Sequence, residues 1–147
     1  MLRLILAAAL VAFASAAHAA DAKQMEENKK VVLQLYEAAI NQKDFEAAAK
    51  FLGPHYTQHN PNAMDGAEGL KAFLAFLREK FPNYHSDIKQ VFADGDYVIL
   101  HVHNVPTPGA RGNAIMDIFR LENGKVVEHW DVRQEIPEKA ANTNTMF

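Results

Sequence analysis

Asp117 is the residue of this chain whose surroundings most strongly indicate chemistry. It lies in the middle of residues 115–119, Ile-Met-Asp-Ile-Phe, a run that alternates as a β-strand does, and its own face carries Ile115, Phe119 and Leu121. Burial among apolar side chains disfavours the ionised carboxylate and raises its pKa toward the range useful for proton transfer. We therefore expect Asp117 to act as a general base, with a hydrogen-bonded structural anchor as the alternative.

A hairpin turn predicts which residues accompany Asp117. Asn123-Gly124 is typical of a two-residue type I′ turn, in which both central residues take a positive φ. Counting back from this turn pairs Asp117 with Trp130 and places Trp130 on the face that we expect to line a pocket. The opposite face is expected to form a surface or a subunit contact, and it carries Met116, Ile118, Arg120, Val127, His129, Asp131 and Arg133.

Two histidines on the preceding segment are candidates to assist Asp117. Residues 97–104 alternate as a strand, with His101 and His103 on one face. If the connection 105–113 closes symmetrically, both imidazoles share the face of Asp117, and one of them lies beside it. A bulge that shifts the pairing by one residue would turn both of them to the other face.

A metal site is an alternative use of the same side chains. His101-x-His103, together with His59 and Asp117, offers nitrogen and oxygen ligands of the kind that bind zinc or iron. The pattern is weak, because it lacks the helical His-Glu-x-x-His spacing. The chain also has no cysteine, which excludes thiol catalysis, iron–sulfur clusters and cysteine-ligated zinc. We expect neither a metal nor another cofactor.

The segments that position these residues are predicted to be helices first and strands second. Apolar residues recur at helical spacing in three segments, and a short extended piece, Tyr56–His59, lies between the second and the third. This order indicates an α+β layer architecture. The predicted helices are Met25–Asn41, Phe45–Leu52 and Gly66–Phe81, and the predicted strands are Asp87–Ala93, Tyr97–Asn104, Ala114–Leu121 and Lys125–Arg133.

The first residues resemble an export signal. Arg3 supplies a positive charge, an apolar run follows, and Ala17-His18-Ala19 fits a cleavage site. The apolar run has about 11 residues, well short of the roughly 20 that span a bilayer. We expect residues 1–19 to be removed and the mature protein to be periplasmic or secreted, without stable membrane association. Cleavage after Ala22 and an uncleaved tether are the alternatives.

Length and charge limit the remaining possibilities. Residues 20–136 have the size of one ordinary domain, and residues 137–147 form a polar tail that is either loose or docked on a neighbouring subunit. The 147-residue chain has 15 basic and 18 acidic residues and a formal net charge of −3, which argues against nucleic acid as a partner. Without disulfides, core packing or oligomerisation must supply the stability.

Several motifs point to a known family. The order of the predicted elements, together with the run from Asp117 to Asp131, closely resembles the SnoaL-like proteins of the nuclear transport factor 2-like superfamily. Residues 56–61, Tyr-Thr-Gln-His-Asn-Pro, and residues 65–69, Asp-Gly-Ala-Glu-Gly, are similar to that family too. The resemblance implies a cone-shaped fold in which three N-terminal helices pack on a curved antiparallel sheet of about four long strands and enclose an apolar pocket.

The resemblance also implies roles for particular residues. In the polyketide cyclase members, an aspartate on a central strand removes a proton α to a carbonyl, and a nearby histidine assists. Asp117 resembles that aspartate, His103 is the position that we align with the histidine, and His59 and Asn60 resemble residues near the pocket mouth. The expected substrate-binding residues are His101, His59, Asn60, Tyr36, Tyr56, Phe119 and Trp130.

The expected activity is an aldol cyclisation or isomerisation of a small apolar carbonyl compound, and two other functions stay open. The same fold serves binding proteins that catalyse no reaction, and it can also serve as an assembly domain. An open cavity with Asp117 and a histidine at its base favours catalysis, whereas a cone filled with side chains favours assembly. By analogy with the fold, we expect a homodimer formed through the outer face of the sheet.

Overall fold

The computed structural model describes residues 21–147, so the expected leader lies outside the described residues. A long helix covers residues 21–36 and continues into a π-helical turn, η1 (Glu37–Asn41). Its apolar side chains Val32, Leu35 and Ala39 are buried, as the amphipathic spacing requires. The first predicted helix is therefore confirmed. Within residues 21–147, no helix is both long enough and apolar enough to cross a bilayer.

Two shorter helices follow. In α2 (Phe45–Ala49), the Asp44 side chain caps the helix by accepting a hydrogen bond from the backbone N–H of Ala47. The third helix, α3 (Gly66–Lys80), agrees closely with its predicted bounds and buries Leu74 and Leu77. The second helix ends earlier than predicted, because the chain from Leu52 onward pairs with a strand.

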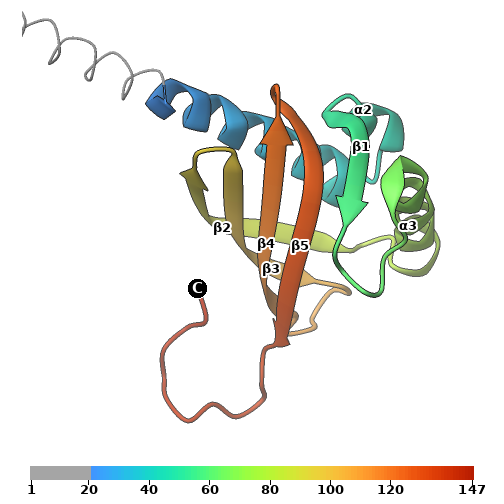
Figure 1. Ribbon diagram of the computed structural model, residues 1–147. Helices are drawn as coiled ribbons and strands as arrows, with labels where there is room; N and C mark the ends of the chain where they lie inside the picture. Colours follow the sequence, from blue (N-terminus) through green and yellow to red (C-terminus); the bar gives the residue numbers. More distant parts are fainter. Residues whose placement is uncertain (1–20) are drawn as a thin grey trace, which may run out of the picture.

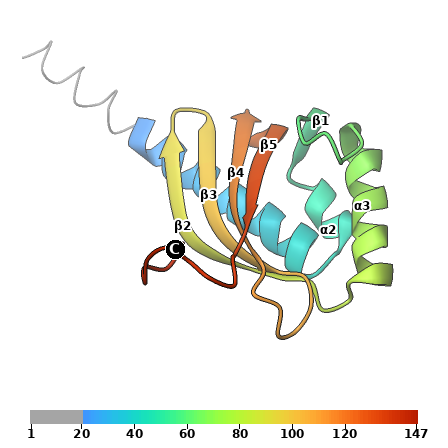
Figure 2. The ribbon, with the colours of Figure 1, turned by 90° about the horizontal axis from the view of Figure 1, so that it is seen from below.

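Five strands form one curved sheet in the order β1-β5-β4-β3-β2. The last four are antiparallel neighbours, and β1 pairs in parallel with β5 at the edge. The sheet curls around the long helix, and α3 lies beyond β1 (Figures 1 and 2). The α+β architecture is confirmed with five strands: β1 (Leu52–Gln58), β2 (His85–Asp94), β3 (Tyr97–Val105), β4 (Asn113–Glu122) and β5 (Lys125–Glu135).

The pairing of β3 with β4 differs from the symmetric closure that the sequence suggested. Leu100 lies opposite Asp117, and His101 lies opposite Met116. His101 and His103 therefore lie on the outer face, and the prediction that they share the face of Asp117 is wrong. The physical reason is burial, because the apolar set of β3 must join the apolar set of β4 on the helix side of the sheet. These buried residues are Val98, Leu100, Val102, Ile115, Phe119 and Leu121.

A β-bulge changes the pairing of β4 with β5. The turn is type I′-like as predicted, with Asn123 and Gly124 at positive φ, and Leu121 pairs with Val126. Arg120, however, pairs with Glu128, so Val127 is an extra residue. Beyond it the alternation is reversed, and Asp117 lies opposite Asp131 rather than Trp130. The predicted faces of Trp130, His129, Asp131 and Arg133 are therefore wrong.

The C-terminal tail folds back on the outer face of the sheet. The ring of Phe147 lies 5.3 Å from that of His101 and 4.7 Å from that of His103, measured between centroids. The Lys89 ammonium lies 5.9 Å from the Phe147 ring. The chain end accordingly lies near β2 in Figure 2. In this single chain the tail contacts its own sheet.

Candidate active site

A cavity of about 180 Å³ lies between the long helix, α3 and the inner face of β4 and β5. Met64 is 64% exposed and also lines the cavity, so the cavity wall reaches the solvent at this residue. The cone is thus hollow, and Asp117 forms part of its wall. The apolar part of the wall is formed by Leu35, Ala39, Ile40, Leu70, Phe73, Ile115 and Phe119.

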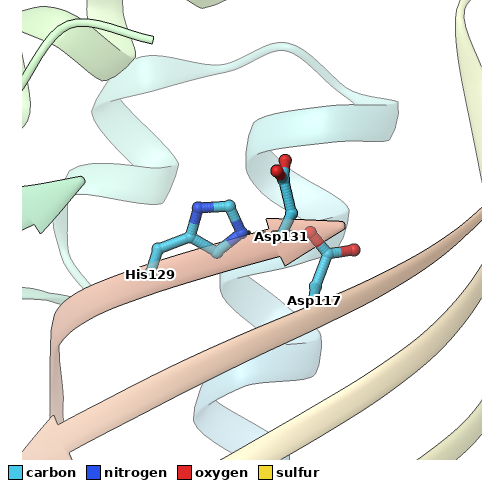
Figure 3. A group of neighbouring side chains, drawn as sticks. All are labelled: Asp117, His129 and Asp131. Atoms are coloured by element: carbon cyan, nitrogen blue, oxygen red, sulfur yellow. Dashed lines mark hydrogen bonds and ion pairs between the residues drawn. The ribbon is translucent and has the colours of Figure 1, made fainter. Parts of the chain in front are cut away.

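Asp117 and His129 form a buried pair. The bulge turns His129 of β5 onto the inner face, where its Nε2 lies 3.0 Å from Oδ1 of Asp117 on β4. Asp117 is 5% exposed and His129 is 9% exposed. Both side chains, with that of Asp131, project from the two neighbouring strands on the side of the helix (Figure 3).

The partners of His129 define where its protons lie. The backbone N–H of Asn60 donates to Oε1 of Gln58, which establishes that atom as an acceptor. His129 Nδ1 lies 2.9 Å from the same oxygen and must therefore donate its hydrogen to it. One further proton is shared between His129 Nε2 and Asp117 Oδ1, either as imidazolium with carboxylate or as imidazole with carboxylic acid. The pair is thus arranged for proton transfer.

The other Asp117 oxygen and a second carboxylate complete the polar part of the site. The hydroxyl of Tyr36 donates to Asp117 Oδ2 at 3.2 Å. Asp131 also lines the cavity, and its two oxygens accept hydrogen bonds of 2.8 and 2.7 Å from the side-chain amide of Asn60. Tyr36 is the last residue before η1, and π-helical turns are frequent at functional sites.

Burial controls the protonation of this site. It raises the pKa of Asp117, and the nearby charge of Asp131 raises it further, whereas the hydrogen bonds from His129 and Tyr36 lower it. The net direction is upward. Burial also raises the pKa of the Tyr36 and Tyr56 hydroxyls, so both stay protonated hydrogen-bond donors. The sequence-based expectation of a perturbed carboxylate is confirmed in direction.

A metal ion would need a different set of ligands from the one predicted. His101 and His103 lie across the sheet from Asp117, so they cannot share an ion with it. Asp117, His129 and Asp131 each offer one ligand atom, and these atoms lie within 4.8 Å of one another. Since His129 Nε2 and Asp117 Oδ1 already bond to each other, an ion would have to replace that hydrogen bond.

The structure brings some of the predicted site residues together and separates others. Asp117, Tyr36, Tyr56, Asn60 and Phe119 all line the cavity. The remaining predicted residues lie outside it. His103 Nε2 lies 2.8 Å from the carbonyl oxygen of Arg111, His101 contacts Phe147, and His59 stacks on Trp130 with ring centroids 4.4 Å apart.

Sequence reasoning missed six polar residues of the cavity, Asn62, Tyr84, Gln58, His129, Asp131 and Arg133. The signal that could have found the last three is the pair Val126-Val127. Two consecutive apolar residues within an alternating strand indicate a bulge, and both valines are fully buried here. Gln58 lies within the predicted extended piece, but its contact with His129 depends on the parallel pairing of β1 with β5, which the sequence did not reveal.

Comparison with known families agrees with this geometry. The model of the SnoaL-like domain matches residues 32–129, from the long helix to the buried histidine. The chain belongs to the SnoaL-like family. No protein with a curated description matches this SnoaL-like chain.

Several solved structures have a similar fold. TsrD from Streptomyces laurentii is 24% identical, with 71% of this chain and 89% of that chain covered and a TM-score of 0.59. A candidate polyketide cyclase from Bacillus cereus ATCC 10987 is 22% identical, with coverages of 73% and 74% and a TM-score of 0.63. A candidate SnoaL-like polyketide cyclase from Jannaschia sp. CCS1 is 22% identical, with coverages of 74% and 86% and a TM-score of 0.61. These likenesses establish the SnoaL-like fold.

Proposed function

We propose that this SnoaL-like protein removes a proton α to the carbonyl group of a small molecule, with Asp117 as the general base. The observation that carries the proposal is a buried carboxylate that lines an open cavity and is hydrogen-bonded to a histidine. The raised pKa of Asp117 makes its carboxylate a stronger base than an exposed aspartate. The names of the similar polyketide cyclases are consistent with this class of reaction.

Residues of the cavity wall can accept the substrate proton and stabilise the enolate that forms. Asp117 accepts the proton of the substrate C–H bond, and the electron pair of that bond moves to the carbonyl oxygen, which forms an enolate. The hydroxyl of Tyr56, which lines the cavity and stays protonated, donates to that oxygen. The enolate then attacks a second carbonyl in an aldol cyclisation, or it takes up a proton at another carbon in an isomerisation.

His129 takes the assisting role that the sequence had suggested for His103. Its Nδ1–H is held by Gln58, so its Nε2 faces Asp117 with a defined orientation. The ring donates its Nε2–H to the carboxylate and so stabilises and orients the ionised base before the reaction, and Asp117 keeps the proton that it receives. Tyr36 supplies a second hydrogen bond, which keeps the carboxylate aligned toward the cavity.

Deuterium exchange tests this proposal without knowledge of the natural product. Ketones of about one ring's size are incubated with the protein in D₂O, and loss of the α-proton signal is followed by NMR. Exchange faster than in buffer is expected for the wild type and is expected to be abolished in Asp117→Asn. Asp94→Asn, which changes an exposed carboxylate at the β2–β3 turn, serves as the matched control and should exchange as the wild type does.

The alternative function, ligand binding without a reaction, predicts a different outcome. In that case, no ketone in the panel exchanges faster than in buffer, and Asp117→Asn alters only the affinity for ligands. Unchanged exchange in Asp117→Asn would exclude this residue as the base.

We further propose a homodimer formed through the outer sheet face, and removal of residues 1–19 on export. Val132 and Phe92, which are 69% and 50% exposed, support the first proposal because they leave apolar surface on that face. The charge pattern of the first residues supports the second. Intact mass measurement of protein purified from its own host should give a chain that begins near Ala20, and a mass that includes Met1 would contradict cleavage.

A further inference from the structure

Arg133 is the arginine of the cavity wall. It follows Asp131 by two residues on β5 and pairs with Ile115, so the bulge turns it onto the same inner face as His129. It lines the cavity, and it is exposed to solvent. Its positive charge lowers the pKa of the Tyr84 hydroxyl, another group of the cavity wall, against the larger raising effect of burial. The positive charge of the guanidinium therefore influences a hydroxyl group that lines the cavity.

Arg133 differs from the other arginines in the described part of the chain. Arg78 donates to the carbonyl oxygen of Lys43, Arg111 donates to that of Ile136, and Arg120 pairs with two glutamates. Within residues 21–147, no such partner binds the side chain of Arg133. Asp131 is its neighbour on the same face, but the carboxylate of Asp131 is occupied by the amide of Asn60. The five N–H donors of Arg133 are thus free for a ligand.

The charges along the cavity orient a polar ligand. Asp117 and Asp131 lie opposite each other in the cavity wall, and Arg133 lies two residues further along β5, at a solvent-exposed position of the same wall. An anionic group is repelled from the carboxylate of Asp131 and attracted to the guanidinium of Arg133. A ligand that carries an anion at one end therefore enters with its uncharged end toward Asp117.

The size of the cavity limits the ligand. An engineered cavity of about 150 Å³ in another protein holds benzene, and this one measures about 180 Å³. Same-face positions two residues apart lie about 7 Å apart along a strand, which is the step from the level of Asp117 and Asp131 to that of Arg133. A molecule of about one ring therefore spans the distance between the two ends.

We propose that the ligand of this cavity is a ketone of about one ring's size that bears a carboxylate, and that Arg133 binds this carboxylate while the ketone faces Asp117 and His129. The planar guanidinium matches a carboxylate in bidentate geometry. This proposal rests on the proposed function for the placement of the ketone. It narrows the substrate to small keto acids.

Calorimetric titration with a matched pair of probes tests the charge requirement. The acid 4-oxo-4-phenylbutanoate and its methyl ester share one ring and one ketone, and the ester carries a methyl group in place of the negative charge. Arg133→Gln is expected to weaken binding of the acid by about tenfold or more, since a hydrogen bond to a charged group contributes this much, and to leave binding of the ester unchanged. Arg133→Lys should retain part of the affinity for the acid.

Arg111→Gln is the matched control, because Arg111 is an exposed arginine outside this cavity. It should bind both probes as the wild type does. Equal affinity of Arg133→Gln and the wild type for the acid would overturn the proposal. Failure of the wild type to bind the acid at millimolar concentration would overturn it as well.

The results separate this proposal from the proposed function. Asp117→Asn should still bind the acid, because the guanidinium is unchanged. If acid binding depends on Arg133 but no α-proton exchanges in the wild type, the keto-acid ligand is supported and the proposal that Asp117 is a general base is contradicted. If exchange depends on Asp117 but Arg133→Gln binds the acid as the wild type does, Asp117 is supported as the general base and the keto-acid ligand is contradicted.

Discussion

At the scale of single residues, the site is a hydrogen-bonded chain that runs from the Asn60 backbone through Gln58 and His129 to Asp117. Because Gln58 Oε1 can only accept hydrogen bonds, His129 Nδ1 must donate to it. The ring is thereby held with its Nε2 toward Asp117. Asp117 ends this chain at the cavity, where burial opposes its ionisation. The site thus combines a carboxylate of raised pKa with a partner that can share its proton.

The pH dependence of activity follows from the direction of this shift. The general base must be ionised, so activity is lost as the pH falls through the pKa of Asp117. Because burial raises the Asp117 pKa from 3.8, we expect the acidic limb of kcat/KM to lie above that value. Measured exchange rates over a range of pH check this, and a limb at or below 3.8 would contradict a buried base.

At the scale of elements, the bulge on β5 determines which residues enter the cavity. Val127 is the extra residue, and it is accommodated because Gly53 of β1 has no side chain at the point of contact. A Cβ at position 53 would lie 2.6 Å from Cγ1 of Val127, closer than packed carbon atoms approach. The parallel edge strand and the bulge therefore depend on each other.

Replacement of Gly53 tests this dependence. Gly53→Ala should lower the free energy of unfolding by about 1–3 kcal/mol, the usual cost of overpacking, in urea titrations. Val127→Ala removes the atom that would clash, so the double variant should lose less stability than the sum of the two single variants. Strict additivity of the two changes would contradict a direct contact between these positions.

At the scale of the whole molecule, the curved sheet separates two environments. Its inner face and the helices enclose the cavity, while its outer face carries His101, His103 and exposed apolar side chains such as Val132. Phe147 covers the histidine part of the outer face. The two strand histidines that the sequence suggested for the site therefore contact the C-terminal residue of the chain.

The proposed homodimer is tested at this outer face. The wild type should be dimeric by light scattering at micromolar concentration, and Val132→Arg should shift it to the monomer, since a charge in an apolar interface is costly to bury. Phe76→Arg places the same charge on α3, where Phe76 is 48% exposed, and should leave the dimer intact. A monomeric wild type would contradict the proposal.

The sequence alone determined the α+β architecture, the end of the long helix, the bounds of α3, the type I′ turn and the burial of Asp117, because these depend on local periodicity and on turn chemistry. The tertiary structure decided the rest. A period of two means that one extra residue reverses every side chain beyond it, so the alternation in the sequence could not tell whether His103 or His129 faces Asp117. Packing of Val127 on Gly53 and burial of the β3 valines decided that choice.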